Sequence, residues 1–183
     1  MIRLEKLLMI GATCRNSGKT ELASMFIRKF SKKYKLIGLK VSAYYGDDEQ
    51  FHSQNQLHLK EKYILIKDTD KSTEKSTAKM LSAGAAETYW LQSKQECLNE
   101  VLQKLLPQLD KEAYIVCESN SLRKEVVPDI FIMIQNNLNP MKNSATGVIK
   151  LADVIVESDG RNFINFDNSM IDIENGKWKL KNG

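Results

Sequence analysis

The stretch Ile10–Phe26, IGATCRNSGKTELASMF, passes from an apolar segment through small polar residues into a helical pattern. Leu7 to Ala12 form a continuous apolar run, which is typical of a strand buried on both faces of a sheet. From Lys19 to Phe30 the apolar residues recur at spacings of three and four, which predicts a helix with one buried stripe. The sequence therefore predicts a strand, a short polar loop and a helix, in that order.

The rest of the chain alternates between strand-like and helix-like patterns. Strands are expected at 35–45, 62–68, 87–92, 113–117, 130–134 and 154–156, and helices at 72–82, 94–109 and 143–151. This alternation predicts an α/β fold in which a mostly parallel sheet carries helices on both faces. The chain, 1–183, is expected to form one domain, with a possible inserted hairpin at 43–68 and a C-terminal β-hairpin turning at Asn175-Gly176.

The composition, with 42% hydrophobic and 27% charged residues, is that of an ordinary globular protein. A net charge of +4 with interrupted basic clusters predicts solvated helix faces and no nucleic-acid partner. The three cysteines have no CxxC spacing, which favours a reducing compartment over a disulfide framework. No apolar stretch approaches the roughly 20 residues that span a bilayer, so we expect a cytoplasmic protein that does not bind membranes.

The loop carries the residue types that a phosphate site requires. Its pattern matches G-x-x-x-x-G-K-[ST], with Thr13 in place of the first glycine. The helix start would supply backbone N–H groups, Lys19 would reach the outer phosphates, and Thr20 would ligate Mg²⁺. A lysine in the first turn is unfavourable for a helix that binds no anion. The expected nucleotide-binding residues are Thr13, Arg15, Asn16, Ser17, Gly18, Lys19, Thr20 and Glu21.

Further polar residues follow other predicted strands, and the carboxyl ends of parallel strands meet at one edge of a sheet. Glu118 and Asp47 are candidate Mg²⁺ ligands beside Thr20, and Glu118 could instead be a surface residue. Lys40 could stabilise the charge on a transferred phosphate, so the expected catalytic residues are Lys19, Lys40 and Glu118.

The segment after the strand at 130–134, FIMIQNNLNPMKNSA, contains no N-K-x-D motif for guanine. Asn136 could contact a base edge, and the choice between ATP and GTP stays open on these residues.

The chain resembles P-loop NTPases of the branch that contains dethiobiotin synthetase and molybdopterin-guanine dinucleotide biosynthesis protein B. The dethiobiotin synthetase loop, G-T-D-T-x-V-G-K-T, has a threonine that corresponds to Thr13, and its G-Y-K-P-V motif is similar to GLKVS around Lys40. In the molybdopterin family, K-D-S-x-R-x-x-x-A-G-A is similar to KSTAKMLSAGA at 75–85, and V-E-G places Glu118. The resemblance covers about residues 7–134.

The resemblance implies a protein that binds GTP, slightly favoured over ATP, and hydrolyses it slowly with Mg²⁺ in an accessory role in cofactor biosynthesis. It also implies a homodimer or a partner protein from cofactor biosynthesis. A second hypothesis is an ATP-dependent kinase or dethiobiotin-synthetase-like ligase, in which Lys40 and Glu118 face a small acceptor. A third is a binding module without catalysis.

Overall fold

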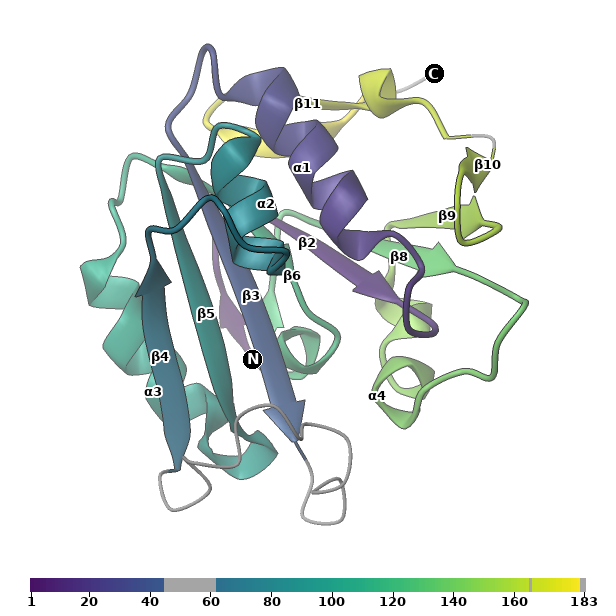
Figure 1. Ribbon diagram of the computed structural model, residues 1–183, viewed down its shortest axis with the longest axis horizontal. Helices are drawn as coiled ribbons and strands as arrows, with labels where there is room; N and C mark the ends of the chain where they lie inside the picture. Colours follow the sequence, from purple (N-terminus) through teal and green to yellow (C-terminus); the bar gives the residue numbers. More distant parts are fainter. Residues whose placement is uncertain (45–61, 165, 182–183) are drawn as a thin grey trace.

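The computed structural model describes residues 1–44, 62–164 and 166–181. Within them, an eight-stranded sheet has the order β10-β9-β8-β2-β6-β3-β5-β4 (Figure 1). Strands β9 to β5 in this order are parallel, and the two edge strands are antiparallel. The predicted α/β class with a mostly parallel sheet is confirmed. The strands of this sheet are β2 (Leu7–Ala12), β3 (Leu36–Tyr44), β4 (Tyr63–Asp68), β5 (Glu87–Lys94), β6 (Tyr114–Glu118), β8 (Ile130–Gln135), β9 (Val154–Ser158) and β10 (Phe163–Ile164).

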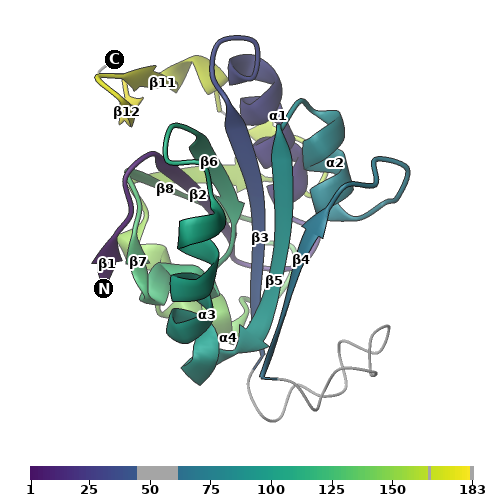
Figure 2. The same ribbon diagram turned by 90° about the vertical axis from the view of Figure 1, so that its left-hand side faces the viewer.

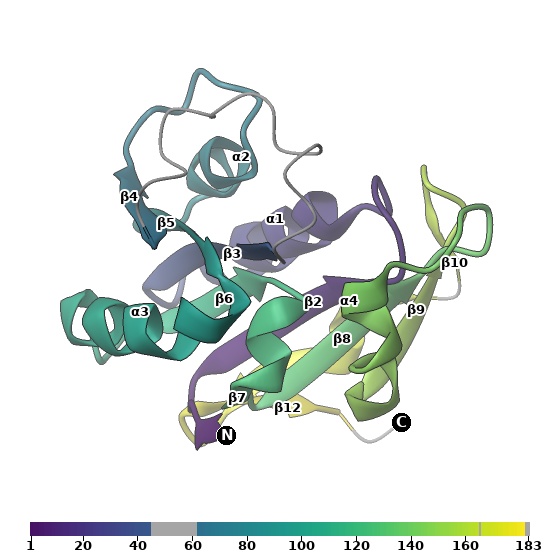
Figure 3. The same cartoon turned by 90° about the horizontal axis from the view of Figure 1, so that it is seen from below.

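Helices cover both faces of the sheet (Figures 2 and 3). On one face α1 (Lys19–Phe30) and α2 (Ser76–Ser82) pack on side chains such as Leu8 and Ile10. On the other face α3 (Leu98–Leu105) and Val148, just after α4 (Asn143–Thr146), pack on side chains such as Met9. Because successive residues of β2 point to opposite faces, its continuous apolar run serves both cores.

The loop between β2 and α1 lies at the carboxyl end of the sheet, where β3, β6 and β8 also end. Two short pairs complete the fold: β1 (Ile2–Arg3) with β7 (Val126–Val127), and β11 (Ile171–Glu174) with β12 (Lys177–Leu180). In the second pair, Asn175 and Gly176 have φ of 51° and 77°, the left-handed values that a tight turn requires. None of the helices in the described residues is long and apolar enough to cross a bilayer.

Of the predicted hairpin at 43–68, the two described ends do not pair with each other. β4 pairs with β5, and β5 lies between β4 and β3. The physical reason is burial: β5 carries buried Tyr89 and Leu91, whereas the half-exposed side chains of β4 suit a sheet edge. Residues 45–61 of the predicted hairpin lie outside the described residues.

Three predicted helices differ from the observed ones. The helix expected from 72 begins at Ser76, because the Asp70 carboxylate accepts the Ser72 N–H at 2.8 Å and holds a turn there. The helix expected at 94–109 is α3 flanked by 3₁₀ turns, Gln95–Cys97 and Leu106–Gln108, the second of which contains Pro107. The helix expected at 143–151 divides at Gly147 into α4 and a 3₁₀ turn, Ile149–Leu151.

Candidate phosphate-binding site

The loop from Thr13 to Gly18 curves tightly between β2 and α1. Asn16 and Gly18 have φ of 55° and 88°, in the left-handed region. The Ser17 hydroxyl donates to the Cys14 carbonyl at 3.0 Å and closes the curve. A β-carbon on Gly18 would lie 3.0 Å from the Phe163 ring, so both conformation and space require glycine there. At the end of this loop the N–H groups of the first turn of α1 have no partner within the helix.

Thr13 anchors the loop to the end of β8. Its N–H donates to the Ile134 carbonyl at 2.9 Å, and its hydroxyl accepts the Asn136 N–H at 3.0 Å. The Thr13 carbonyl accepts the Lys142 N–H at 2.8 Å. Thr13 is only 2% exposed. Its hydroxyl makes a buried hydrogen bond to Asn136 that the glycine of the standard pattern could not make. Thr13 therefore links the start of the loop to the end of β8.

Asn120 holds the end of β2 from the other side. Its side-chain oxygen accepts the Ala12 N–H and its amide nitrogen donates to the Ala12 carbonyl, both at 2.9 Å. A β-carbon on Gly11 would lie 2.7 Å from the Asn120 oxygen, so glycine at position 11 leaves room for this clamp. Sequence reasoning placed Asn120 in a polar cluster but gave it no role.

We expect Asn120→Ala to lower the free energy of unfolding by about 2–3 kcal/mol, because it leaves the N–H and C=O of buried Ala12 unpaired. Urea denaturation measures this loss, with Asn139→Ala as the control because Asn139 is exposed. A loss as small as that of the control would show that water replaces the clamp without cost.

A chain of polar contacts crosses the mouth of the loop. Lys40 and Glu118 are register partners on β3 and β6, with Lys40 Nζ 4.0 Å from Glu118 Oε2. Lys40 also donates to the Ser76 hydroxyl oxygen at 2.6 Å, and the Thr20 hydroxyl donates to the same oxygen at 3.0 Å. Ser76, in the first turn of α2, thus joins the two groups expected at phosphate and metal. Sequence reasoning placed Ser76 in a family-like segment but did not single it out.

Glu118 is 3% exposed, and its Oε1 atom has no hydrogen-bond partner within the described residues. Burial lowers the pKa of Lys19, the Glu118 carboxylate opposes this shift, and the Lys40 ammonium adds to it. A buried carboxylate oxygen without a partner is costly unless a cation or donor approaches it. Lys19 and Glu118 are therefore close enough to influence one another at the base of the loop.

The protein oxygens at this site suit Mg²⁺ only if a bound phosphate supplies further ligands. In the described ranges, no group of three or more His, Cys, Asp or Glu side chains could hold a metal ion. The Thr20 hydroxyl and Glu118 Oε1 are the available oxygens, and Mg²⁺ commonly takes one or two protein ligands plus phosphate and water. Asp47, the other predicted ligand, lies outside the described residues.

Among the residues that the structure describes, the cations at this mouth outnumber the one nearby carboxylate, Glu118. Burial, followed by the charges of Lys19 and Arg15, lowers the pKa of Lys142 to about 8, and Lys40 contributes in the same direction. Apart from the long Lys40–Glu118 contact, no ion pair engages Lys19, Lys40 or Lys142 within the described part of the chain.

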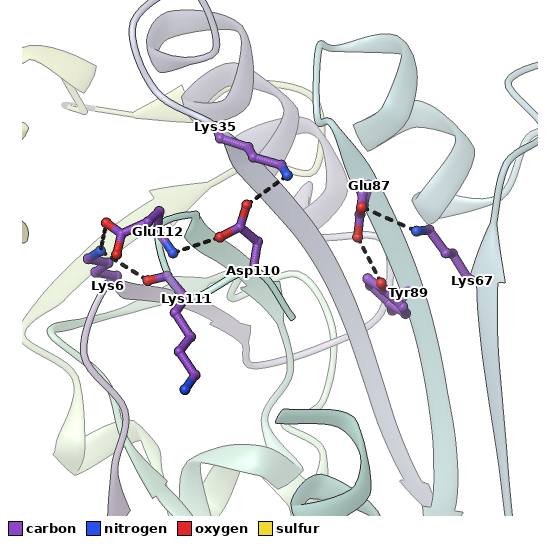
Figure 4. A network of polar contacts seen from close by, with 8 residues as sticks. All are labelled: Lys6, Lys35, Lys67, Glu87, Tyr89, Asp110, Lys111 and Glu112. Carbon is purple, nitrogen blue, oxygen red and sulfur yellow. Dashed lines mark hydrogen bonds and ion pairs between the residues drawn. The ribbon is translucent and has the colours of Figure 1, made fainter. Parts of the chain in front are cut away.

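The opposite end of the sheet is balanced in charge (Figure 4). There Lys35 pairs with Asp110 at 2.7 Å, and Lys67 pairs with Glu87 at 3.2 Å. The Lys6 ammonium lies 3.3 Å from Glu112. The excess of cations is thus a feature of the loop mouth, and such an excess favours an anionic ligand.

The remaining predicted residues lie further out or are engaged within the protein. Arg15 and Asn16 are exposed on the loop, and Glu21 pairs with Arg28 at 2.9 Å on the outer side of α1. Asn136 is buried, and its side-chain oxygen accepts the Leu138 N–H at 2.8 Å. Lys142 was missed by sequence reasoning because no local pattern distinguishes it from a surface lysine.

No protein-family model, curated protein or solved structure matches this chain.

Proposed function

We propose that this protein binds a nucleoside triphosphate with Mg²⁺ at the loop between β2 and α1. The observation that supports it most is the convergence of Lys19, Lys40 and Lys142 on the start of a helix, beside one buried carboxylate, Glu118. A polyphosphate would offset these charges and accept hydrogen bonds from the free N–H groups of α1.

Each group has a role in this proposal. The loop N–H groups and Lys19 hold the outer phosphates, and Lys40 offsets charge that develops on the terminal phosphoryl group. Thr20 and the free Glu118 oxygen would hold Mg²⁺, which would lower the negative charge of the phosphates. To reach these ligands, Thr20 and Lys40 must exchange their bonds to Ser76 for bonds to the bound species.

The resemblance to the molybdopterin-guanine dinucleotide branch supports GTP slightly over ATP, slow hydrolysis and an accessory role in cofactor biosynthesis. A kinase or ligase that acts on a small acceptor is the second candidate, because Lys40 keeps 36% of its side chain exposed beside the proposed terminal phosphate. Turnover separates the two: a hydrolase releases phosphate from nucleotide alone, whereas an acceptor-dependent enzyme releases little.

Thermal unfolding with ATP and GTP, each with Mg²⁺ or with a chelator, tests the binding proposal. A ligand at about 100 times its dissociation constant stabilises a protein by about 2.7 kcal/mol, which a melting curve resolves. We expect such a shift with at least one nucleotide and Mg²⁺. No shift with either nucleotide up to millimolar concentration would refute the proposal.

Glu118→Gln is expected to weaken the apparent affinity for Mg²⁺ in the nucleotide complex by about 10–100-fold, because it removes the charge but keeps the shape of a metal-holding group. Titrating Mg²⁺ against the nucleotide-dependent melting shift measures this. Glu112→Gln, an exposed residue at the far end of the sheet, is the control. An identical Mg²⁺ dependence in Glu118→Gln and wild type would remove Glu118 from the metal site.

A further inference from the structure

Lys142 approaches the loop from a different side than Lys40. It lies just before α4, and its N–H donates to the Thr13 carbonyl at 2.8 Å, which fixes its backbone against the first loop residue. Lys40 and Ser76 approach from β3 and α2, and α2 and α4 pack on opposite faces of the sheet (Figure 3). The loop mouth is therefore flanked by cations from two separate parts of the fold.

The Lys142 side chain is half-buried among other positive charges. The charges of Lys19, Arg15 and Lys40 all lower the pKa of the Lys142 ammonium. Lys29, whose pKa burial also lowers, differs from Lys142 because it donates to the Asn168 and Ile171 carbonyls at 2.6 and 2.8 Å. Within the described residues the Lys142 ammonium has no hydrogen-bond acceptor, so its position brings no evident structural benefit.

We propose that Lys142 binds the terminal phosphate of the nucleotide from the β8–α4 side, opposite Lys40, and so makes the site selective for triphosphates over diphosphates. The inference rests on the proposed nucleotide-binding function. The terminal phosphate is the group indicated because Lys142 is fixed at Thr13, the first loop residue, at the same edge of the sheet as Lys40, which the proposal assigns to that phosphate. The inner phosphates would instead be surrounded by the N–H groups of the loop.

Calorimetric titration of Lys142→Gln with Mg²⁺-nucleoside triphosphate and with Mg²⁺-nucleoside diphosphate tests the inference. A charge-assisted contact to the terminal phosphate predicts a loss of about tenfold or more in triphosphate affinity and less than about threefold in diphosphate affinity. Lys142→Arg keeps the charge and should retain most of the triphosphate affinity. Lys150→Gln, an exposed lysine on the following 3₁₀ turn, is the matched control and should bind both nucleotides as wild type does.

The melting temperature without ligand supplies a second readout. Lys142→Gln removes a charge that its neighbours repel, so the ligand-free variant should melt at the same or a higher temperature than wild type. A lower melting temperature together with equal losses for both nucleotides would show a structural role and overturn the inference. Unchanged affinities would overturn it as well.

The outcomes distinguish this inference from the proposed function. If wild type binds triphosphate, Lys19→Ala does not, and Lys142→Gln binds as wild type does, only the role of Lys142 falls. If wild type binds neither nucleotide, the proposed function falls and the role of Lys142 falls with it.

Discussion

Lys19→Ala is expected to abolish the stabilisation that Mg²⁺-nucleotide gives to the wild-type protein. At a concentration about 100 times the wild-type dissociation constant, the gain of about 2.7 kcal/mol should fall to less than about 0.5 kcal/mol. The reason is that Lys19 is the cation in the first turn of α1, where the proposed site places the phosphates against it and the helix N–H groups. Thermal unfolding with and without nucleotide measures the difference.

The same variant should fold normally without ligand. Burial lowers the pKa of Lys19, and a positive charge is unfavourable at a helix N-terminus, so the ligand-free variant should be at least as stable as wild type. Lys33→Ala is the control, because Lys33 is an exposed lysine just beyond the other end of α1. If nucleotide raises the melting temperature of Lys19→Ala as much as that of wild type, the nucleotide does not bind at this loop.

Trp178→Ala is expected to lower the free energy of unfolding by about 3–5 kcal/mol. Trp178 is 1% exposed, and its ring meets those of Phe26, Phe30 and Tyr114 edge to face, with centroids 6.5, 5.2 and 5.9 Å away. Its indole N–H donates to the Lys6 carbonyl at 3.0 Å. The substitution therefore leaves a cavity where the β11–β12 hairpin covers α1 and the start of β2. It also removes one of the two hydrogen bonds that the Lys6 carbonyl accepts, the other coming from the Ile115 N–H at 2.8 Å.

Urea denaturation measures the Trp178 loss, and Trp90→Ala is the matched control because Trp90 is only partly buried on β5. The control should lose clearly less stability than Trp178→Ala. Nucleotide affinity of the folded Trp178→Ala protein should stay near the wild-type value, since the hairpin packs at the end of the sheet away from the loop. A cost below about 1 kcal/mol would mean that the hairpin does not cover α1 in solution.

Local pattern was sufficient for the central part of the fold. The predicted strand Leu7–Ala12 and helix Lys19–Phe30 match β2 and α1 at both ends. Burial on both faces gives a strand a continuous apolar run, and burial of one face gives a helix apolar residues at spacings of three and four. Gly18-Lys19-Thr20 lies at the start of the helix. The alternation of such patterns also predicted the α/β class and the convergence of Lys40 and Glu118, because parallel strands end at a common edge.

Local pattern failed where an element owes its place to distant partners. The position of β4 at the sheet edge depends on how well β5 competes for the interior, and neither strand encodes that order by itself. The ends of α2 and α4 depend on a side-chain turn at Asp70 and on a glycine at 147. These choices involve few residues and small energies, so propensity alone does not predict them.

The sequence by itself determined the strand–loop–helix unit and the layered α/β class. Only the tertiary structure decided that Asn120 clamps Ala12, that Ser76 bridges Thr20 and Lys40, and that Lys142 joins Lys19 at the loop. The physical reason is range: periodicity and capping act over a few residues, whereas these contacts join segments that only the strand order of the sheet brings together.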